Sequence, residues 1–100
     1  MVADPLSPAT EQRLQLLFAP ADQERVRVAL IEECGRNIPG NTMAGFERLR
    51  CAALKISGGD SAKLHAAIDL AKIDFRDMLM WANCANDVEA HLKWLPEQTW

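Results

Sequence analysis

The sequence predicts an all-α protein, a compact bundle of five to six short helices with irregular or orthogonal packing. Three observations support this fold class. Helix-favouring Ala, Leu, Glu, Lys and Arg dominate the composition. No long stretch alternates apolar with polar residues, and no Asn-Gly or Asp-Gly dipeptide marks a hairpin. Capping and breaking residues divide the chain into helix-length pieces. One hundred residues suit one core, so we expect a single domain over 1–100, with 1–7 flexible and 96–100 as a tail.

The first two helices are predicted from proline and capping signals. Ser7 followed by Pro8 is typical of an N-cap and a first helical position, and this helix should end near Phe18. Pro20 opens a second helix that runs to Cys34, where a glycine follows. Apolar residues cover more than one side of this second helix. We therefore interpret it as the central helix, packed by several neighbours.

The middle of the chain holds the third and fourth predicted helices. Thr42 can cap a helix that runs to about Ser57. The sequence Ser-Gly-Gly-Asp at 57–60 combines a glycine stop with a new aspartate cap, Asp60. The fourth helix should then cover 61–72.

Two more helices are predicted in the last third of the chain. Asp74 is a candidate cap, and Ile73 and Met78 have the spacing of a hydrophobic staple. This spacing favours a break and a separate helix over 75–82, although one continuous helix over 61–82 remains an alternative. Asn86 and Asp87 would cap a short final helix that stops before Pro96.

Composition and charge restrict the classes of protein. The chain is 49% hydrophobic and 25% charged, as in ordinary globular domains. No apolar run approaches the roughly 18 residues of a membrane span. The N-terminus lacks the basic and apolar regions of a signal peptide, so we expect a cytoplasmic protein. A net charge of -3 argues against nucleic-acid binding, which usually requires a basic excess.

The cysteines and histidines predict neither a disulfide framework nor a metal site. Three cysteines at wide spacings leave an odd count. Cys-x-x-Cys and His-x-x-x-His pairs, the usual local signature of structural zinc, are missing from the sequence. We expect no metal and no cofactor. Cys34 is predicted to be a core residue, whereas Cys51 falls on the outer side of its helix near Lys55 and is predicted to be an exposed thiol.

Two further charged positions have a structural and a functional interpretation each. Arg50 lies close to the apolar arc of its helix, so we expect a partly buried arginine paired with a carboxylate from another helix. A ligand-binding arginine is the alternative. His65 and Asp69 lie one helical turn apart, and we interpret them as an exposed pair rather than a catalytic dyad, so no catalytic residue is predicted.

DNA binding is an alternative function. Two helices joined by the turn at 57–60 resemble a helix-turn-helix in outline, and Arg48, Arg50, Lys55 and Lys63 lie near that turn. The second helix of this pair is only weakly basic, however, because it also carries Asp69. A DNA-binding regulator and a small enzyme with an unrecognised site remain the alternatives to protein association.

Protein association is the favoured function because the 75–82 helix has excess apolar surface. Its segment 78–81 is apolar on almost every side, which requires either a sandwiched core helix or a face that meets a partner. Methionine and tryptophan are enriched in interfaces. The candidate interface residues are Met78, Met80, Trp81, Trp94 and Trp100. We expect an interaction or accessory protein, with self-association through the 75–82 helix and the C-terminal tail as one form.

Three segments show a resemblance when taken together. They are EECGRNIP at 32–39, ALKISGGD at 53–60 and AKIDFRDML at 71–79. Together they resemble small uncharacterised bacterial proteins of about this length, over residues 12–96. The resemblance implies no activity, cofactor or catalytic residue.

Overall fold

The computed structural model describes residues 6–34, 38, 43–84 and 90–98, and within these ranges the protein is helical and free of strands. The elements are α1 (Pro8–Leu17), α2 (Pro20–Glu33), α3 (Met43–Ser57), α4 (Ser61–Trp81) and the short 3₁₀ turn η1 (Ala90–Leu92). The chain is compact, with a radius of gyration of 12.0 Å. The all-α prediction is confirmed, with four α-helices in the described ranges where we expected five to six.

The N-terminal helix begins as its sequence predicts. The Ser7 side chain accepts a hydrogen bond from the Thr10 amide, and Pro8 occupies the first helical turn. Leu6 is buried in the core. Residues 6 and 7 therefore belong to the fold, although we expected all of 1–7 to be flexible, because the cap and the leucine anchor them.

The turn between α3 and α4 also agrees with the prediction. Gly58 and Gly59 have φ values of 55° and 94°, in the left-handed region that glycine adopts without strain. The Asp60 side chain then accepts hydrogen bonds from the amides of Ala62 and Lys63. The glycine stop and the aspartate cap fix a tight reversal, and α4 returns along α3.

The predicted break within α4 is confirmed at Asp74. This residue has non-helical backbone angles, φ -156° and ψ 105°, and its side chain accepts a hydrogen bond from the Arg76 amide at 2.9 Å. The helix thus stops and restarts on a local cap. The second piece ends at Trp81, and Asn83 just beyond it has a φ of 60°, while the Cys84 amide bonds to the Leu79 carbonyl.

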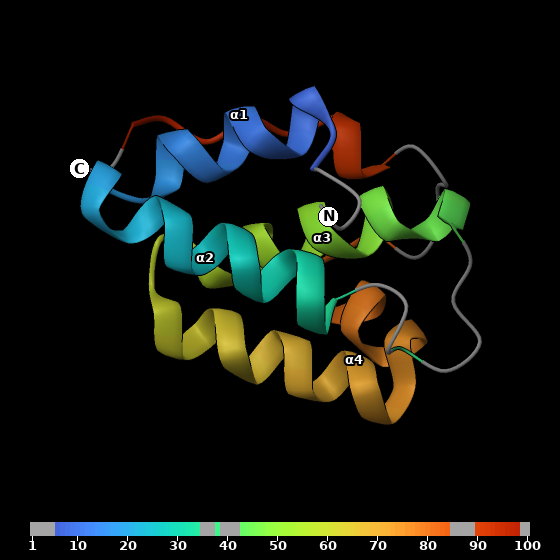
Figure 1. Cartoon of the computed structure of the whole chain (residues 1–100). Helices are drawn as coiled ribbons and strands as arrows, with labels where there is room; N and C mark the ends of the chain where they lie inside the picture. The colour runs from blue at the N-terminus through green and yellow to red at the C-terminus, as the bar shows by residue number, and fades with distance from the viewer. Residues whose placement is uncertain (1–5, 35–37, 39–42, 85–89, 99–100) are drawn as a thin grey trace.

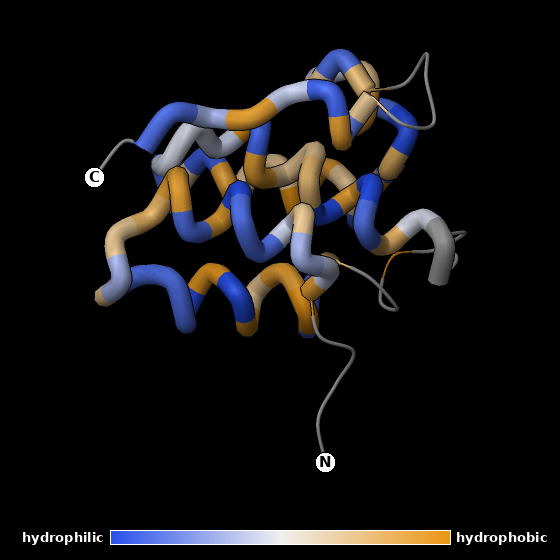
Figure 2. The backbone as a smooth tube through the Cα atoms, turned by 90° about the horizontal axis from the view of Figure 1, so that it is seen from above, coloured by the Kyte–Doolittle hydropathy of each residue, from blue (hydrophilic) through white to orange (hydrophobic). Residues whose placement is uncertain are grey.

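The central helix is α3, which contacts α1, α4 and η1 (Figure 1). Four consecutive side chains of α3 are fully buried, namely Cys51, Ala52, Ala53 and Leu54. Our prediction that the second helix is central is wrong, because α2 packs mainly against α1, whereas α3 contacts three elements, and α2 leaves Val28 41% exposed. The small side chains of α3 let neighbouring helices approach from several sides. Apolar and polar residues alternate along the helices in Figure 2, as expected where each helix has a core side and a solvent side.

The C-terminal segment is mostly extended. Of the predicted final helix, the described residues contain η1 alone, whereas residues 93–98 are not helical and run beside α1 (Figure 1). The carbonyls of Leu92 and Trp94 accept hydrogen bonds from Arg13 of α1. These carbonyls therefore bond to α1 instead of to amides of a C-terminal helix. The predicted caps Asn86 and Asp87, and the predicted cap Thr42, lie outside the described residues. None of the described helices has the length and apolarity that crossing a membrane requires.

Candidate functional site

The second piece of α4 ends in an exposed apolar pair. Met80 is 68% exposed and Trp81 is 53% exposed, and both lie on the last turn of the helix. Met78, two residues earlier, is completely buried and packs in the core. Both explanations offered for this segment thus apply, because one side of the helix serves the core and the other faces solvent. Met80 and Trp81 are the candidate interface residues that reach the surface here.

The C-terminal candidates lie elsewhere. Trp94 is half-buried against the core, and Trp100 lies outside the described residues. In Figure 1 the end of α4 lies at the bottom of the molecule, while the C-terminal segment runs along the top beside α1. The 75–82 helix and the described part of the tail therefore do not form one continuous surface. The sequence could not show this separation, because residues that are close in the sequence need not lie on the same surface of the folded protein.

Arg50 is buried as predicted, and it serves the end of a neighbouring helix. Its guanidinium donates hydrogen bonds to the carbonyls of Leu30, Ile31 and Cys34, at 3.1, 3.4 and 3.0 Å. The guanidinium also lies 5.2 Å from the centre of the Phe46 ring. These contacts use main-chain carbonyls where we expected a carboxylate, because the carbonyls of the last turn of α2 gather at its C-terminus. They give Arg50 a structural role.

Cys51 corrects another prediction, because its side chain is fully buried rather than exposed. The Thr10 hydroxyl of α1 lies 3.1 Å from its sulfur, so α1 covers the side of α3 that we assigned to solvent. Burial raises the pKa of the Cys51 thiol. Burial likewise raises the pKa of Cys34, here to about 12, and Cys34 is a core residue as predicted. Neither thiol is activated, since the thiolate is the reactive form.

A chain of polar side chains crosses the interface between α1, α3 and η1. Thr10 links Cys51 to Ser7, whose oxygen lies 2.9 Å from the Thr10 hydroxyl. Ser7 is hydrogen-bonded to Glu47, and Glu47 is paired with His91 at 3.0 Å. Five side chains from three segments therefore form one continuous, largely buried hydrogen-bond network.

The donor and acceptor of each hydrogen bond in this network can be assigned from the carboxylate of Glu47, at which the bonds from Ser7 and His91 meet. An ionised carboxylate only accepts, so both Ser7 and His91 donate to it. Ser7 has a single hydrogen, which means that Thr10 donates to Ser7 and that the Cys51 thiol donates to Thr10. The network therefore has one consistent orientation, and the charge of Glu47 fixes it. Networks of this kind orient the elements that they join relative to one another.

The charge of Glu47 should make stability depend on pH. The hydrogen bonds from Ser7 and His91 hold the pKa of Glu47 below its usual value. A lowered folded-state pKa stabilises the protein at pH values above the usual pKa, and this stabilisation is lost as the pH falls through the folded-state pKa. We expect Glu47→Gln to lower the free energy of unfolding by about 1 kcal/mol at neutral pH, measured by urea denaturation, and the gap to the wild type to narrow as the pH falls through the folded-state pKa of Glu47.

A matched control separates this effect from the general loss of a charge. Glu32 is an exposed residue of α2, so Glu32→Gln should leave stability within about 0.5 kcal/mol of the wild type. A gap between Glu47→Gln and the wild type that stays constant from neutral to acid pH would show that the charge of Glu47 contributes nothing.

The C-terminal segment 90–98 is attached to α1 mainly through Arg13. One guanidinium nitrogen of Arg13 donates to the carbonyls of Leu92 and Trp94, at 3.3 and 2.8 Å, and the other donates to Ala9 within α1. The guanidinium also lies 5.5 Å from the centre of the Trp94 ring, within the range of a cation–π contact. His91 adds the second attachment through Glu47.

This contact leaves several polar atoms without partners. Arg13 Nε, His91 Nδ1 and Trp94 Nε1 are buried and make no hydrogen bond within the described part of the chain. Each such atom costs about 1–3 kcal/mol relative to a satisfied one. All three belong to the contact between α1 and the C-terminal segment, so this contact is less well satisfied than the core.

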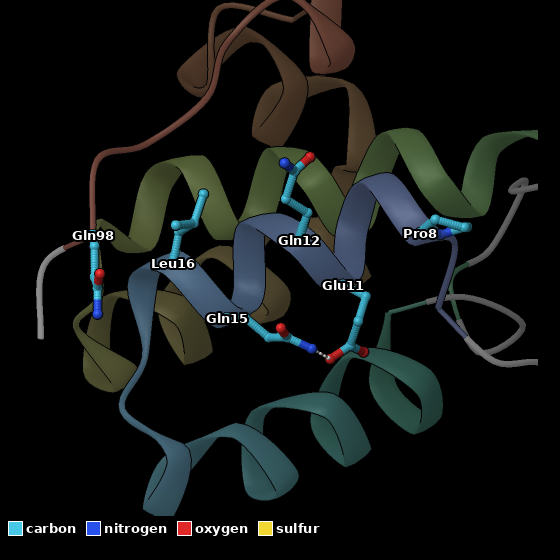
Figure 3. A pocket seen from close by; sticks show the side chains of 6 residues that line it. All are labelled: Pro8, Glu11, Gln12, Gln15, Leu16 and Gln98. Carbon is cyan, nitrogen blue, oxygen red and sulfur yellow. Dashed lines mark hydrogen bonds between the residues drawn. The ribbon is translucent and has the colours of Figure 1, made fainter.

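A shallow hollow of about 500 Å³ lies on the outer side of α1 (Figure 3). Its lining comprises Pro8, Glu11, Gln12, Gln15, Leu16 and Gln98. Glu11 is the ionisable member of this set, and it is engaged by Arg27 and Gln15. The lining therefore offers mainly amide groups and no pairing of a nucleophile with a base.

Several basic residues considered for DNA binding have partners inside the protein. Arg50 holds the end of α2, and Arg48 donates to the Cys84 carbonyl at 2.6 Å. Lys72 pairs with Glu33 across α4 and α2. His65 and Asp69 are both exposed on α4. The basic groups near the turn at 57–60 are thus partly used to hold helices together.

Sequence reasoning missed the polar network and the contact with Arg13. Glu47 and His91 are separated by 44 positions, and Arg13 and Trp94 by 81. No local spacing links such residues. The available signal was weak: a single arginine in the first helix, next to Leu14, and a histidine three residues before a tryptophan.

Comparison of the chain with family models, with curated proteins and with solved structures finds no match. The resemblance to small bacterial proteins stays a prediction.

Proposed function

We propose that this protein functions by protein association, and that it self-associates through the exposed end of α4. One observation carries the proposal: Met80 and Trp81 stand next to each other, 68% and 53% exposed. Large side chains of these two kinds are enriched in interfaces, and tryptophan is among the residues that most often dominate binding energy. An accessory or regulatory role would follow from such an interaction.

The charges beside this pair support a second copy as the partner. Arg76 and Asp77 are exposed on the preceding turn, and their spacing from Met80 and Trp81 places all four on one side of the helix. This face carries one positive and one negative charge around two apolar groups. A two-fold interface brings the same face together twice, so each Arg76 can meet the other copy's Asp77.

Light scattering over a concentration series tests the proposal. We expect the average mass of the wild type to rise from 11.1 kDa toward twice that value as concentration increases. The variant carrying Met80→Asp and Trp81→Asp should associate at least about 30-fold more weakly than the wild type. Both side chains face solvent, so circular dichroism and urea denaturation should be unchanged.

Val28→Asp is the matched control, since Val28 is an exposed apolar residue of α2, 41% exposed. This variant should associate like the wild type. A wild-type mass that stays at the monomer value up to millimolar concentration, or equal association of the α4 variant, would refute self-association through this surface.

A further inference from the structure

The attachment of the C-terminal segment 90–98 has the features of a bound peptide. Two of its contacts are hydrogen bonds that Arg13 donates to the main-chain carbonyls of Leu92 and Trp94. Two side chains turn inward, the buried imidazole of His91 and the half-buried indole of Trp94. Leu92 and Leu95 are 44% and 56% exposed, so apolar burial of these leucines does not hold the segment.

The receiving surface is formed by α1 and α3. Arg13 donates hydrogen bonds to two alternate carbonyls of the segment and places its positive charge over the indole ring. Glu47 accepts a hydrogen bond from the imidazole. Glu47 is itself oriented by Ser7. This surface therefore selects a segment that carries an imidazole in a short turn and, three residues later, an indole in extended chain.

The same contact is imperfectly satisfied. Arg13 Nε, His91 Nδ1 and Trp94 Nε1 are all buried without partners in the described chain. These orphaned atoms regain water when the segment leaves, which favours release relative to a fully satisfied contact. Segments held in this way open more readily than a packed core does.

We propose that residues 90–98 form a detachable C-terminal latch, and that the α1–α3 surface beneath it is a peptide-docking site that accepts the 90–98 segment of a second copy. The protein's own 90–98 segment therefore competes with the 90–98 segment of a second copy for the same site. The proposal is independent of the exposed end of α4, since it uses none of the same residues.

A labelled synthetic peptide of sequence AHLKWLPEQ, residues 90–98, tests the docking site by fluorescence anisotropy on the full chain. The resident latch lowers apparent affinity by the fraction of molecules in which the site is open. Trp94→Ala in the protein weakens the latch, so this variant should bind the peptide at least about tenfold more tightly than the wild type. Arg13→Ala in the protein should abolish binding.

Variation of the peptide provides a control that cannot disturb folding. A peptide that carries Trp94→Ala should bind at least about tenfold more weakly than the native peptide, because it lacks the indole that Arg13 contacts. Equal binding of the two peptides, or equal affinity of the wild-type protein and its Trp94→Ala variant, would overturn the proposal.

Nitrogen-15 relaxation dispersion on the wild-type protein provides a second measurement. The Trp94 indole and the Lys93 amide, which bonds to the Ala90 carbonyl, should share one exchange process on the microsecond-to-millisecond timescale. The Leu54 amide at the centre of α3 should lack it. Flat profiles for the indole and for Lys93 would show a latch that does not open, and would overturn the proposal even if the variants failed to fold.

Discussion

Arg50→Ala is expected to lower the free energy of unfolding by about 3 kcal/mol, because it removes a buried charged donor that joins α3 to the carbonyls at the end of α2. Arg50 is 4% exposed, and its guanidinium donates to the carbonyls of Leu30, Ile31 and Cys34. Its positive charge also lies at the negative end of the α2 dipole. Urea denaturation at neutral pH measures the loss.

Two further arginine variants separate the possible causes of this loss. Arg50→Lys keeps the charge but lacks the planar fork of donors, so it should fall between the wild type and Arg50→Ala. Arg25 is 63% exposed in its pair with Asp22, and Arg25→Ala should cost less than about 0.5 kcal/mol. A loss for Arg50→Ala as small as that of Arg25→Ala would contradict the structural role of Arg50.

Leu54→Ala is expected to lower the free energy of unfolding by about 3–5 kcal/mol, among the largest effects of a single core substitution. Leu54 is fully buried on α3, the helix that α1, α4 and η1 share. The cavity left by the leucine would be lined by these packed elements. Because each of them is held in place by its neighbours, they cannot move easily to fill the cavity. The total free energy of unfolding of a domain of this size is roughly 5–15 kcal/mol, so the variant should be close to unfolding.

The control for Leu54 is an apolar residue that the structure leaves in solvent. Val28→Ala removes methyl groups from a side chain that is 41% exposed, and alanine favours the helix more than valine does. The change in stability should be within about 0.5 kcal/mol of zero. Similar losses at the two positions would show that α3 is not the centre of the core.

The sequence predicted the local structure well because local structure depends on near neighbours. Ser7 and Asp60 cap their helices as the sequence indicates, and the break at Asp74 is real. Each of these features depends on a side chain bonding to an amide two or three residues away. Much of the core side of each helix was also predictable, since apolar spacing follows the helical period.

What the sequence alone could not determine was which side of a helix a neighbour covers. Cys51 has the polar surroundings of an exposed position on its own helix, yet α1 packs over it and Thr10 bonds to it. The sequence likewise overrated the second helix as the centre of the bundle. Its apolar residues suggested several neighbours, but the small residues of α3 allow closer approach, so the other helices gather there.

The polar contacts that join distant segments were decided by tertiary structure. Arg50 could be predicted to be buried, but its carbonyl partners on α2 could not, because main-chain acceptors carry no sequence signal. Glu47 and His91 meet only because α3 and the C-terminal segment pack together. The sequence by itself determined an all-helical chain with its caps, its break and its apolar α4 segment. The tertiary structure decided that Met78 faces the core while Met80 and Trp81 face solvent, because a packed helix can bury only the side that its neighbours cover.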